Sequence, residues 1–310
     1  MTIQQLLYVV ALDNHRHFVK AAESCFVAQP TLTLQVKKLE EEIGLIIFDR
    51  TSQPLVPTPM GKRFIQKARE ILRDIGDLKD MVNSEKGQME GFYTLGIIPT
   101  LAPYLLPRFI KQFSDAHPGV KLEIKEMQSL EIVKALKGDL LDIGIMATPV
   151  DDNSIREILL FHEPFLVYAC QGHPLLEKEE IDVADITDEG LWLLNEGHCF
   201  RNQVLNICNK TGKANKTREF TFESGSIETI KNMVQHDMGY SLVPELSITN
   251  PFDKPLVRRF SEPQLTREIS LVVHQSFTKE VLLDHLRQTI VASIPPGFKK
   301  NSSFVRVKWK

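Results

Sequence analysis

The sequence predicts two folded parts: an all-α winged helix-turn-helix head with a long linker helix, and an α/β domain behind it. Residues 1–58 contain three stretches with helical patterning, followed by two short apolar β-like runs. From Phe92 onward, short apolar strands alternate with helical stretches, a pattern typical of α/β domains. A chain of 310 residues is long enough for two or three domains of about 100–200 residues each.

The composition is that of a globular protein with a substantial core, since 43% of residues are hydrophobic and 25% are charged. No apolar run approaches the roughly 18 residues that a transmembrane helix needs. The first residues lack the basic and apolar regions of a signal peptide. We therefore expect a cytoplasmic protein and not a secreted solute-binding protein.

Charge is distributed unevenly along the chain, whose net charge is −3. Residues 1–69 hold nine Lys or Arg against six Asp or Glu, a net charge of +3, so the remainder carries −6. A mildly basic head on an acidic body favours a nucleic-acid partner at the N-terminal end.

The head begins with a capping-box sequence at Thr2 that predicts a helix to about Asn14. A second helix is predicted at about 17–24. A third is predicted at about 29–43, with a proline in its first turn and Gly44 as its C-terminal stop. Two helices joined by a tight turn predict a helix-turn-helix, whose second helix enters the major groove of DNA.

The first residues of that third helix are the predicted base readers, because Gln can pair with adenine and Thr can donate, accept or touch a thymine methyl group. Two apolar runs, 46–50 and 54–57, predict a two-stranded wing that presents a basic residue to phosphate or the minor groove. The predicted DNA-contacting residues are Gln29, Pro30, Thr31, Thr33, Lys37 and Arg50.

The linker helix begins at Thr58, an N-cap residue, followed by a proline at the first helical position. Its apolar residues recur in steps of four and three, which is a heptad seam. Behind a DNA-reading head, such a seam predicts dimerisation. The predicted dimerisation residues are Phe64, Ala68, Ile71, Ile75, Leu78 and Val82. Residues 87–91, rich in glycine, predict a hinge.

Two of the four cysteines, Cys199 and Cys208, lie at the start of and within a stretch that is predicted to be helical from Phe200 onward, near His198 and Arg201. A cationic neighbour lowers the pKa of a thiol. In a helix, the nine steps from Cys199 to Cys208 would place their Cα atoms roughly 13 Å apart along the axis. A disulfide needs Cα atoms within about 7 Å of each other. The pair could bridge only if the helix unwound, which predicts a redox switch. A plain structural role stays open, because free cysteines are often buried like small hydrophobes.

The remaining pattern predicts an α/β body followed, after Pro295, by a polar, basic and mobile tail. Cys170 closes an apolar run and Cys25 occupies a core position of the head, so both are expected to be buried packing residues. The predicted strands cover 92–98, 120–127, 142–146, 164–170, 191–195, 218–222, 239–243, 256–260 and 268–274. The predicted helices cover 101–117, 129–137, 200–210, 226–236 and 279–292.

The head resembles the LysR-type transcription regulators over about its first 65 residues. The matching residues are Phe18, Ala21, Ala22, Gln29, Pro30, Thr33, Leu39, Glu40, Gly44, Phe48, Arg50, Thr58 and Gly61. The resemblance implies a periplasmic-binding-protein-like effector domain of two subdomains joined by crossover strands. The implied boundaries are 1–58 for the DNA-binding domain, 59–86 for the linker helix, 87–91 for the hinge and 92–310 for the effector domain, with subdomain I at about 92–162 and 268–300 and subdomain II at about 163–267.

Within that family, residues 197–208, 98–107 and 228–234 resemble the OxyR peroxide sensors. This likeness implies that Cys199 is the peroxidatic cysteine and Cys208 the resolving one. It also implies that four residues bind peroxide and stabilise the thiolate: Thr100, Ser129, His198 and Arg267. Arg201, a cation two positions after Cys199, is added to this set. Three positions depart from the usual pattern, namely Ala28 for Ser, Ser129 for Thr and Asn202 for Asp.

The implied function is a redox-sensing transcription activator of oxidative-stress genes that is not an enzyme and needs no cofactor or metal. Its implied partners are double-stranded operator DNA, hydrogen peroxide, RNA polymerase and further copies of itself, as a dimer and a dimer of dimers. The main alternative is a LysR-type regulator that binds a small metabolite between its subdomains. A thiol peroxidase is disfavoured by the DNA-binding head, and a zinc site at His198, Cys199 and Cys208 lacks a fourth ligand at suitable spacing.

Overall fold

The computed structural model describes residues 1–52, 54–85, 89–187, 190–208, 224–236, 239–298 and 304–309. They form two compact units. The first consists of Met1–Met89 with Gly138–Leu140, and the second of Glu90–Lys137 with Leu141–Lys310. Within the described residues, no helix combines the length and apolar character needed to cross a membrane.

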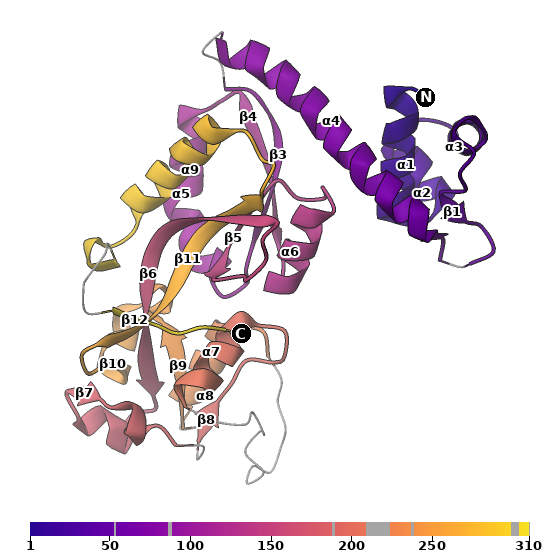
Figure 1. Ribbon diagram of the computed structural model, residues 1–310. Coiled ribbons are helices and arrows are strands. Elements are labelled where there is room, and N and C mark those ends of the chain that lie inside the picture. The colour runs from indigo at the N-terminus through magenta and orange to yellow at the C-terminus, as the bar shows by residue number, and fades with distance from the viewer. Residues whose placement is uncertain are drawn as a thin grey trace. The chain divides into compact units, whose positions relative to one another are not determined.

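The first unit is the predicted winged helix-turn-helix with its long helix (Figure 1). Its described elements are α1 (Ile3–His15), α2 (Phe18–Ser24), α3 (Gln29–Ile43), β1 (Phe48–Asp49), β2 (Val56–Pro57) and α4 (Pro59–Glu85). The predicted capping box is present, since the Gln5 N–H donates to Thr2 Oγ1 and the Thr2 N–H donates to Gln5 Oε1. Gly44 ends α3 in the left-handed conformation, with φ of 64°.

One apolar core holds the head together. It combines the inner faces of the three short helices with residues of the wing and of α4: Tyr8, Val9, Leu12, Ala21, Ala22, Leu32, Val36, Leu39, Ile47, Phe48, Leu55 and Ile65. The start of α4 is fastened to the wing, because Thr58 Oγ1 accepts the Gly61 N–H and donates to the Ile46 carbonyl.

The predicted seam of α4 is therefore divided. Phe64 packs against the head core and Ala68 is only 2% exposed within the single chain. Leu78, by contrast, is 61% exposed. The Val82 side chain lies outside the described part of the molecule. Ile71 and Ile75 are half-buried, so among the described seam residues the exposure to a partner increases toward the distal end.

The second unit is the α/β domain. Its described strands are β3 (Gly91–Ile97), β4 (Val120–Glu126), β5 (Ile143–Thr148), β6 (Ile155–Ala169), β7 (Glu180–Ile181), β8 (Leu191–Trp192), β9 (Tyr240–Pro244), β10 (Val257–Phe260), β11 (Gln264–His274) and β12 (Phe304–Arg306). Its described α-helices are α5 (Ala102–Ala116), α6 (Ser129–Lys137), α7 (Cys199–Ile207), α8 (Ile227–Gln235) and α9 (Glu280–Ser293). The strand order is β4-β3-β5-β11-β6-β10-β7, with β12 beside β11 and with β9 between β6 and β8.

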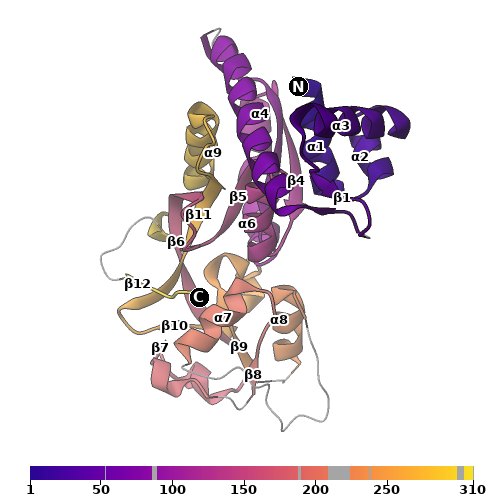
Figure 2. The same ribbon diagram turned by 45° about the vertical axis from the view of Figure 1, so that its right-hand side comes forward.

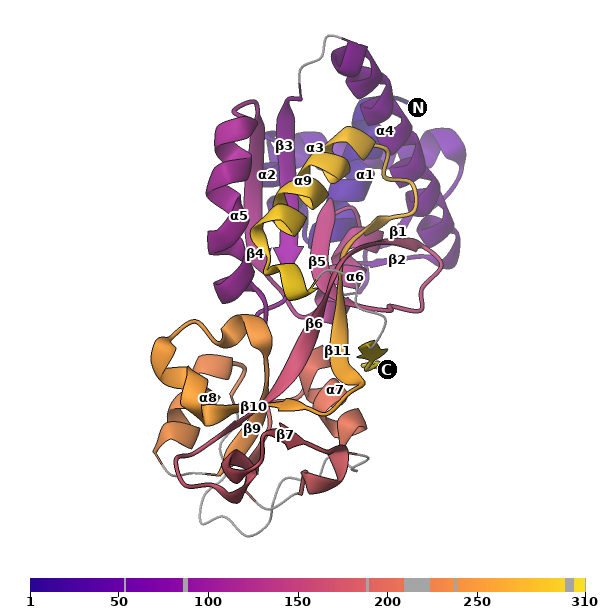
Figure 3. The same ribbon diagram turned by 90° about the vertical axis from the view of Figure 1, so that its left-hand side faces the viewer.

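The two long strands β6 and β11 run antiparallel and pass from one half of the domain to the other (Figure 3). In the first half, β3 pairs in parallel with β4 and β5, α5 and α9 lie side by side on one face, and α6 covers the other (Figures 1 and 3). In the second half, β8 and β9 lie with α7 and α8. This is the predicted pair of subdomains joined by crossover strands.

The structure differs from the sequence-based expectations in several places. Gly91, predicted as part of a hinge, opens β3 and pairs with Val120; residues 87 and 88 of that hinge and the predicted strand 218–222 lie outside the described residues. The crossover strand starts at Ile155, earlier than predicted. Cys25 and Cys170, both predicted to be buried, are partly exposed.

The C-terminal end departs most from expectation. It was predicted to be mobile, yet residues 304–306 form β12, and the side chains of Val307 and Trp309 are buried. The apolar residues Phe304, Val305, Val307 and Trp309 stand among basic and polar neighbours at the end of the chain, which is why the sequence was interpreted as a polar tail.

Candidate functional site

The site is built around the start of α7. Gly197 has a φ of +93°, a conformation that L side chains rarely adopt. The same glycine is close to Gln128, because an added Cβ would lie 2.3 Å from Gln128 Oε1. His198 is the N-cap, and Cys199 is the first residue of the helix. Backbone N–H groups at a helix N-terminus favour a negative charge, so the local fold places the Cys199 sulfur where a thiolate is stabilised.

The structure brings together residues that lie far apart in the sequence. Around Cys199, which is 4% exposed, are buried polar side chains contributed by the loop after β3, the first turn of α6, the N-cap of α7 and the strand β11: Thr100, Ser129, His198 and Arg267. Each of these was predicted for the site from the sequence.

Arg267 is the central cation of this cluster. Its Nη1 donates to Thr100 Oγ1 at 2.9 Å and its Nη2 donates to the Thr100 carbonyl at 3.2 Å. Its guanidinium also lies over the ring of Phe200, 5.2 Å from the centroid. Arg267 thus joins β11 to the loop that begins α5 and to the first turn of α7.

Glu163 balances this cation and was not predicted from the sequence. Its Oε2 accepts from Arg267 Nε at 2.8 Å, and its Oε1 accepts the Leu246 N–H at 2.9 Å. Burial raises the pKa of Glu163, an effect opposed by Arg267. A signal was present in the sequence, because Glu163 is a charge at the edge of the long apolar run that begins at Phe165.

Opposing effects act on the Cys199 thiol. Burial raises its pKa, while the Ser129 hydroxyl, the Arg267 cation and the N–H groups of Phe200 and of Cys199 itself favour the thiolate. Burial dominates, so the resting sulfur is held as a thiol. Ser129 Oγ lies near enough to the sulfur to favour the thiolate. Among the described residues it has no partner that meets the usual distance and angle limits of a hydrogen bond. Its hydroxyl is therefore available to an incoming molecule.

The sequence predicted that His198 and Arg201 stabilise the thiolate as neighbours of Cys199, but the structure gives both residues different surroundings. Burial lowers the pKa of His198, so this imidazole is neutral at neutral pH and acts as a polar neighbour, not a cation. Arg201 Nη1 donates to the Leu194 carbonyl at 2.8 Å. The cation that acts on Cys199 in this structure is Arg267.

Cys208 is the C-cap of α7, and its N–H donates to the Val204 carbonyl at 3.1 Å. The whole helix therefore lies between the two cysteines, and at 1.5 Å per residue it separates them by roughly 13 Å along its axis. All four cysteines are thiols in this structure. A Cys199–Cys208 disulfide would require α7 to unwind.

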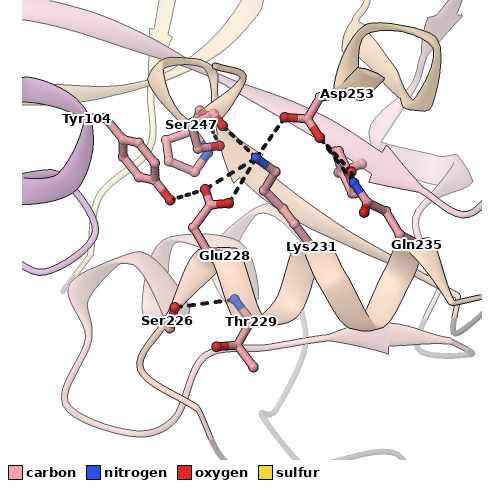
Figure 4. A network of polar contacts seen from close by, with 10 residues as sticks. Tyr104, Ser226, Glu228, Thr229, Lys231, Gln235, Ser247 and Asp253 are labelled. Atoms are coloured by element: carbon pink, nitrogen blue, oxygen red, sulfur yellow. Dashed lines mark hydrogen bonds and ion pairs between the residues drawn. The ribbon is translucent and has the colours of Figure 1, made fainter. Parts of the chain in front are cut away.

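A second polar network lies on α8 (Figure 4). Lys231 is buried, with Nζ 2.8 Å from Asp253 Oδ2 and 2.7 Å from the Ser247 carbonyl. The adjacent Glu228 accepts from the Tyr104 hydroxyl at 2.8 Å. Since Tyr104 belongs to α5 and Glu228 to α8, this network ties the two subdomains together beside the thiol cluster. It occupies part of the 228–234 segment singled out in the sequence.

On the head, four of the predicted DNA-contacting residues lie in the first five residues of α3, Lys37 lies further along the same helix, and Arg50 follows β1. Gln29, Pro30, Thr31 and Lys37 are exposed and Thr33 is half-buried. Ala28 is the N-cap and makes no side-chain cap hydrogen bond, because its methyl group cannot accept one. Arg50 lies in an ion pair with Glu40, with Nη2 2.8 Å from Oε2.

Among the described residues, no group of three His, Cys, Asp or Glu side chains is arranged to hold a metal ion. The polar groups around Cys199 are hydroxyls, an imidazole and an ion pair, which suit a small polar molecule that accepts and donates hydrogen bonds.

Comparison with known families matches both units. Residues 3–62 match the model described as bacterial regulatory helix-turn-helix protein, lysR family, and residues 86–294 match the LysR substrate binding domain. The chain belongs to the LysR family. The two matches cover the predicted head and the predicted effector domain in that order, so the predicted fold class is confirmed.

Named LysR-family relatives are similar over nearly the whole chain. The DNA-binding transcriptional dual regulator OxyR of Escherichia coli K12 is 34% identical over 302 residues, covering 97% of this chain and 98% of its own. Full-length OxyR of Pseudomonas aeruginosa, solved as a cysteine-to-aspartate variant, is 34% identical with a TM-score of 0.79, covering 95% and 99% of the two chains. A cysteine variant of Corynebacterium glutamicum OxyR, solved with hydrogen peroxide bound, is 25% identical with a TM-score of 0.61, covering 94% and 92%.

Proposed function

We propose that this protein is a DNA-binding transcription regulator that senses hydrogen peroxide by oxidation of Cys199 to a Cys199–Cys208 disulfide and so controls oxidative-stress genes. The observation that carries the proposal is the position of Cys199 at the N-terminus of α7. There the buried thiol meets Arg267 and Ser129 on one side, while the resolving cysteine stands at the other end of the same helix.

The chemistry requires only peroxide as oxidant. The Cys199 thiolate attacks one peroxide oxygen, the O–O bond breaks, and the departing hydroxide takes a proton to become water, leaving sulfenic acid on Cys199. The Cys208 thiolate then attacks the Cys199 sulfur, and the S–O bond breaks with release of a second water. Two thiols and one peroxide thus give one disulfide and two waters.

Each buried side chain around Cys199 has a role in these reaction steps. Arg267 stabilises the attacking thiolate. The Ser129 and Thr100 hydroxyls hold the peroxide oxygens, and the neutral His198 is able to donate or accept a proton at the same place. Arg201, hydrogen-bonded to Leu194, supports the turn that leads into α7.

The disulfide is the signal. It closes a ten-residue loop that α7 cannot accommodate, and such a crosslink restricts the open chain by about 2.7 kcal/mol in the loop-entropy estimate. That is comparable to the few kcal/mol that separate the states of a switch. Refolding of the segment then alters how the effector domains associate, and the heads, joined as dimers through the exposed part of α4, bind operator DNA differently.

Peptide mapping after a stoichiometric pulse of hydrogen peroxide tests the proposal. The wild type should give a Cys199–Cys208 disulfide and altered transcription from a regulated promoter. Cys208→Ser should stop at sulfenic acid, which a dimedone probe captures at Cys199. Cys199→Ser should lose the response, since a hydroxyl is a far weaker nucleophile at neutral pH.

The matched control is Cys170→Ser. Cys170 is more exposed than either proposed redox cysteine, so a response governed by accessibility alone would be lost in this variant. A retained response in Cys170→Ser with loss in Cys199→Ser supports the site. Unmodified Cys199 at micromolar peroxide would contradict it.

Metabolite sensing is a second candidate, favoured by one observation. An open hollow of about 490 Å³ is lined by residues of both subdomains, including Arg108, Glu245, Lys254 and Phe298. Its lining residues include neither Cys199 nor Arg267. Arg108→Ala would therefore weaken a metabolite response while leaving disulfide formation unchanged.

A further inference from the structure

The C-terminal segment Phe304–Trp309 is attached to the strand that carries Arg267. Residues 304–306 pair in parallel with Gln264–Thr266 of β11, and the Val307 N–H donates to the Thr266 carbonyl at 2.8 Å. Val307 and Trp309 are buried, Trp309 to 4% exposure. The last described residues are thus a docked element beside the thiol cluster.

The same segment is bound by α7. Gln203 Nε2 donates to the Val307 carbonyl at 2.9 Å, and Asn206 Nδ2 donates to the Lys308 carbonyl at 2.9 Å. Figure 2 shows the end of the chain beside α7. Both donors lie between Cys199 and Cys208, three residues apart, and positions three apart share one face of a helix.

These two hydrogen bonds exist only while α7 is helical. Unwinding the segment between the cysteines would turn Gln203 and Asn206 to different directions, since only helical spacing keeps them on one face. The carbonyl groups of Val307 and Lys308 would lose their donors. The buried Gln203 amide would lose an acceptor inside the protein, which is the costlier loss.

We propose that Phe304–Trp309 is a strap that holds α7 in its helical, reduced form and detaches when the Cys199–Cys208 disulfide forms. Gln203 and Asn206 are the positioning residues that fasten it. The strap thereby sets how strongly oxidising the surroundings must be before the switch changes state. This inference rests on the proposed function of the two cysteines.

Asn206→Ala is the decisive variant, with Asn202→Ala as its matched control. Both asparagines are exposed on α7, but only Asn206 bonds to the described residues of the strap. Alanine is the better helix former, so in both variants helix propensity alone would make disulfide formation harder. Loss of the strap bond acts in the opposite direction, and only in Asn206→Ala.

The measurement is equilibration of each reduced full-length protein with glutathione buffers, where oxidised glutathione accepts the two electrons and both thiol protons and becomes two reduced molecules. Intact mass gives the disulfide fraction. We expect Asn206→Ala to raise the equilibrium constant for disulfide formation about fivefold over Asn202→Ala, the value of one typical hydrogen bond. Trp309→Ala, which removes the buried anchor, should raise it further, and Val305→Ala, at an exposed strap position, should not change it.

Amide exchange of residues 304–309 gives an independent readout. The strap amides should be protected in the reduced protein and exchange at least about tenfold faster in the disulfide form. Equal values for the two asparagine variants, or a strap that stays protected after oxidation, would overturn the strap while leaving the redox pair intact. Failure of the wild type to form the Cys199–Cys208 disulfide would instead overturn the proposed function and the strap with it.

Discussion

Arg267 and Glu163 face each other across the crossover strands β11 and β6, as register partners whose charged groups approach to 2.7 Å. Both side chains are almost completely buried. The same guanidinium also donates to Thr100 and favours the Cys199 thiolate, so the ion pair is connected to the thiol at the junction of the two subdomains.

The two partners of this pair should affect Cys199 in opposite directions. Arg267→Gln removes the cation that favours the thiolate, so the pKa of Cys199 should rise and its reaction with peroxide at pH 7 should slow by about tenfold or more. Glu163→Gln removes the opposing anion and should lower that pKa. Stopped-flow rates of sulfenic acid formation measure both changes.

Each of these variants also breaks a buried ion pair, which costs about 3–5 kcal/mol of stability in typical cases. The melting temperature should therefore be lower in both variants than in the wild type. The opposite signs of the rate changes separate the electrostatic effect from structural loss, and equal slowing in both variants would count against a role of Arg267 in activating Cys199.

The reactivity of Cys199 should depend steeply on pH. Its pKa is raised from the ordinary value of 9.0 because it is buried, so the thiolate fraction increases about tenfold per pH unit below that pKa. In a Cys25→Ser, Cys170→Ser, Cys208→Ser background, the rate of sulfenic acid formation should climb between pH 7 and pH 9. A plateau at or below pH 8 would mean that the reacting conformation differs from this one.

The same shift has a consequence for stability. A thiol whose pKa is higher in the folded than in the unfolded chain stabilises the fold fully below the unfolded value, and this contribution is lost as pH rises through the folded value. Cys199→Ser should therefore show a smaller decrease in free energy of unfolding above pH 9 than the protein with Cys199. Denaturant titrations at pH 8 and pH 10 measure the difference.

The seam of α4 should respond differently at its two ends. Leu78→Asp places a charge at an exposed position, so it should weaken dimerisation without lowering the melting temperature of the head. Ala68→Asp buries an unpaired carboxylate within the single chain and should destabilise the head itself by several kcal/mol. Sedimentation and thermal unfolding together distinguish the two, and an unchanged oligomer in Leu78→Asp would exclude the distal seam as an interface.

DNA binding should depend on Gln29 and Arg50 in distinct ways. Gln29→Ala should lose about 1–3 kcal/mol for the proper operator and relax the base preference at one position. Arg50→Ala should weaken all sequences alike and reduce the salt slope by about one unit. It should also free Glu40, whose Oε1 accepts the N–H groups of Ile47 and Phe48 and so holds the wing. Full operator affinity in both variants would refute the proposed contacts.

The sequence by itself determined the local structure of the head and the helical start of α7. Thr2, Gly44 and Thr58 mark helix ends through caps and backbone conformations that depend on a few neighbouring residues, and the structure has each where the pattern predicted it. The separation of Cys199 and Cys208 followed from helical geometry in the same way. Such features are readable from sequence because their physical causes lie within a few residues along the chain.

Only the tertiary structure decided which groups surround Cys199. Glu163 and Arg267 lie 104 residues apart and meet through the register of two strands, which no local pattern specifies. The neutral state of His198 follows from its burial. Arg201 is closer to Cys199 in sequence than Arg267 is, yet its side chain donates to the Leu194 carbonyl. The docking of Val307 and Trp309 was likewise invisible in the sequence, because burial of a short segment depends on the surface that the rest of the chain presents to it.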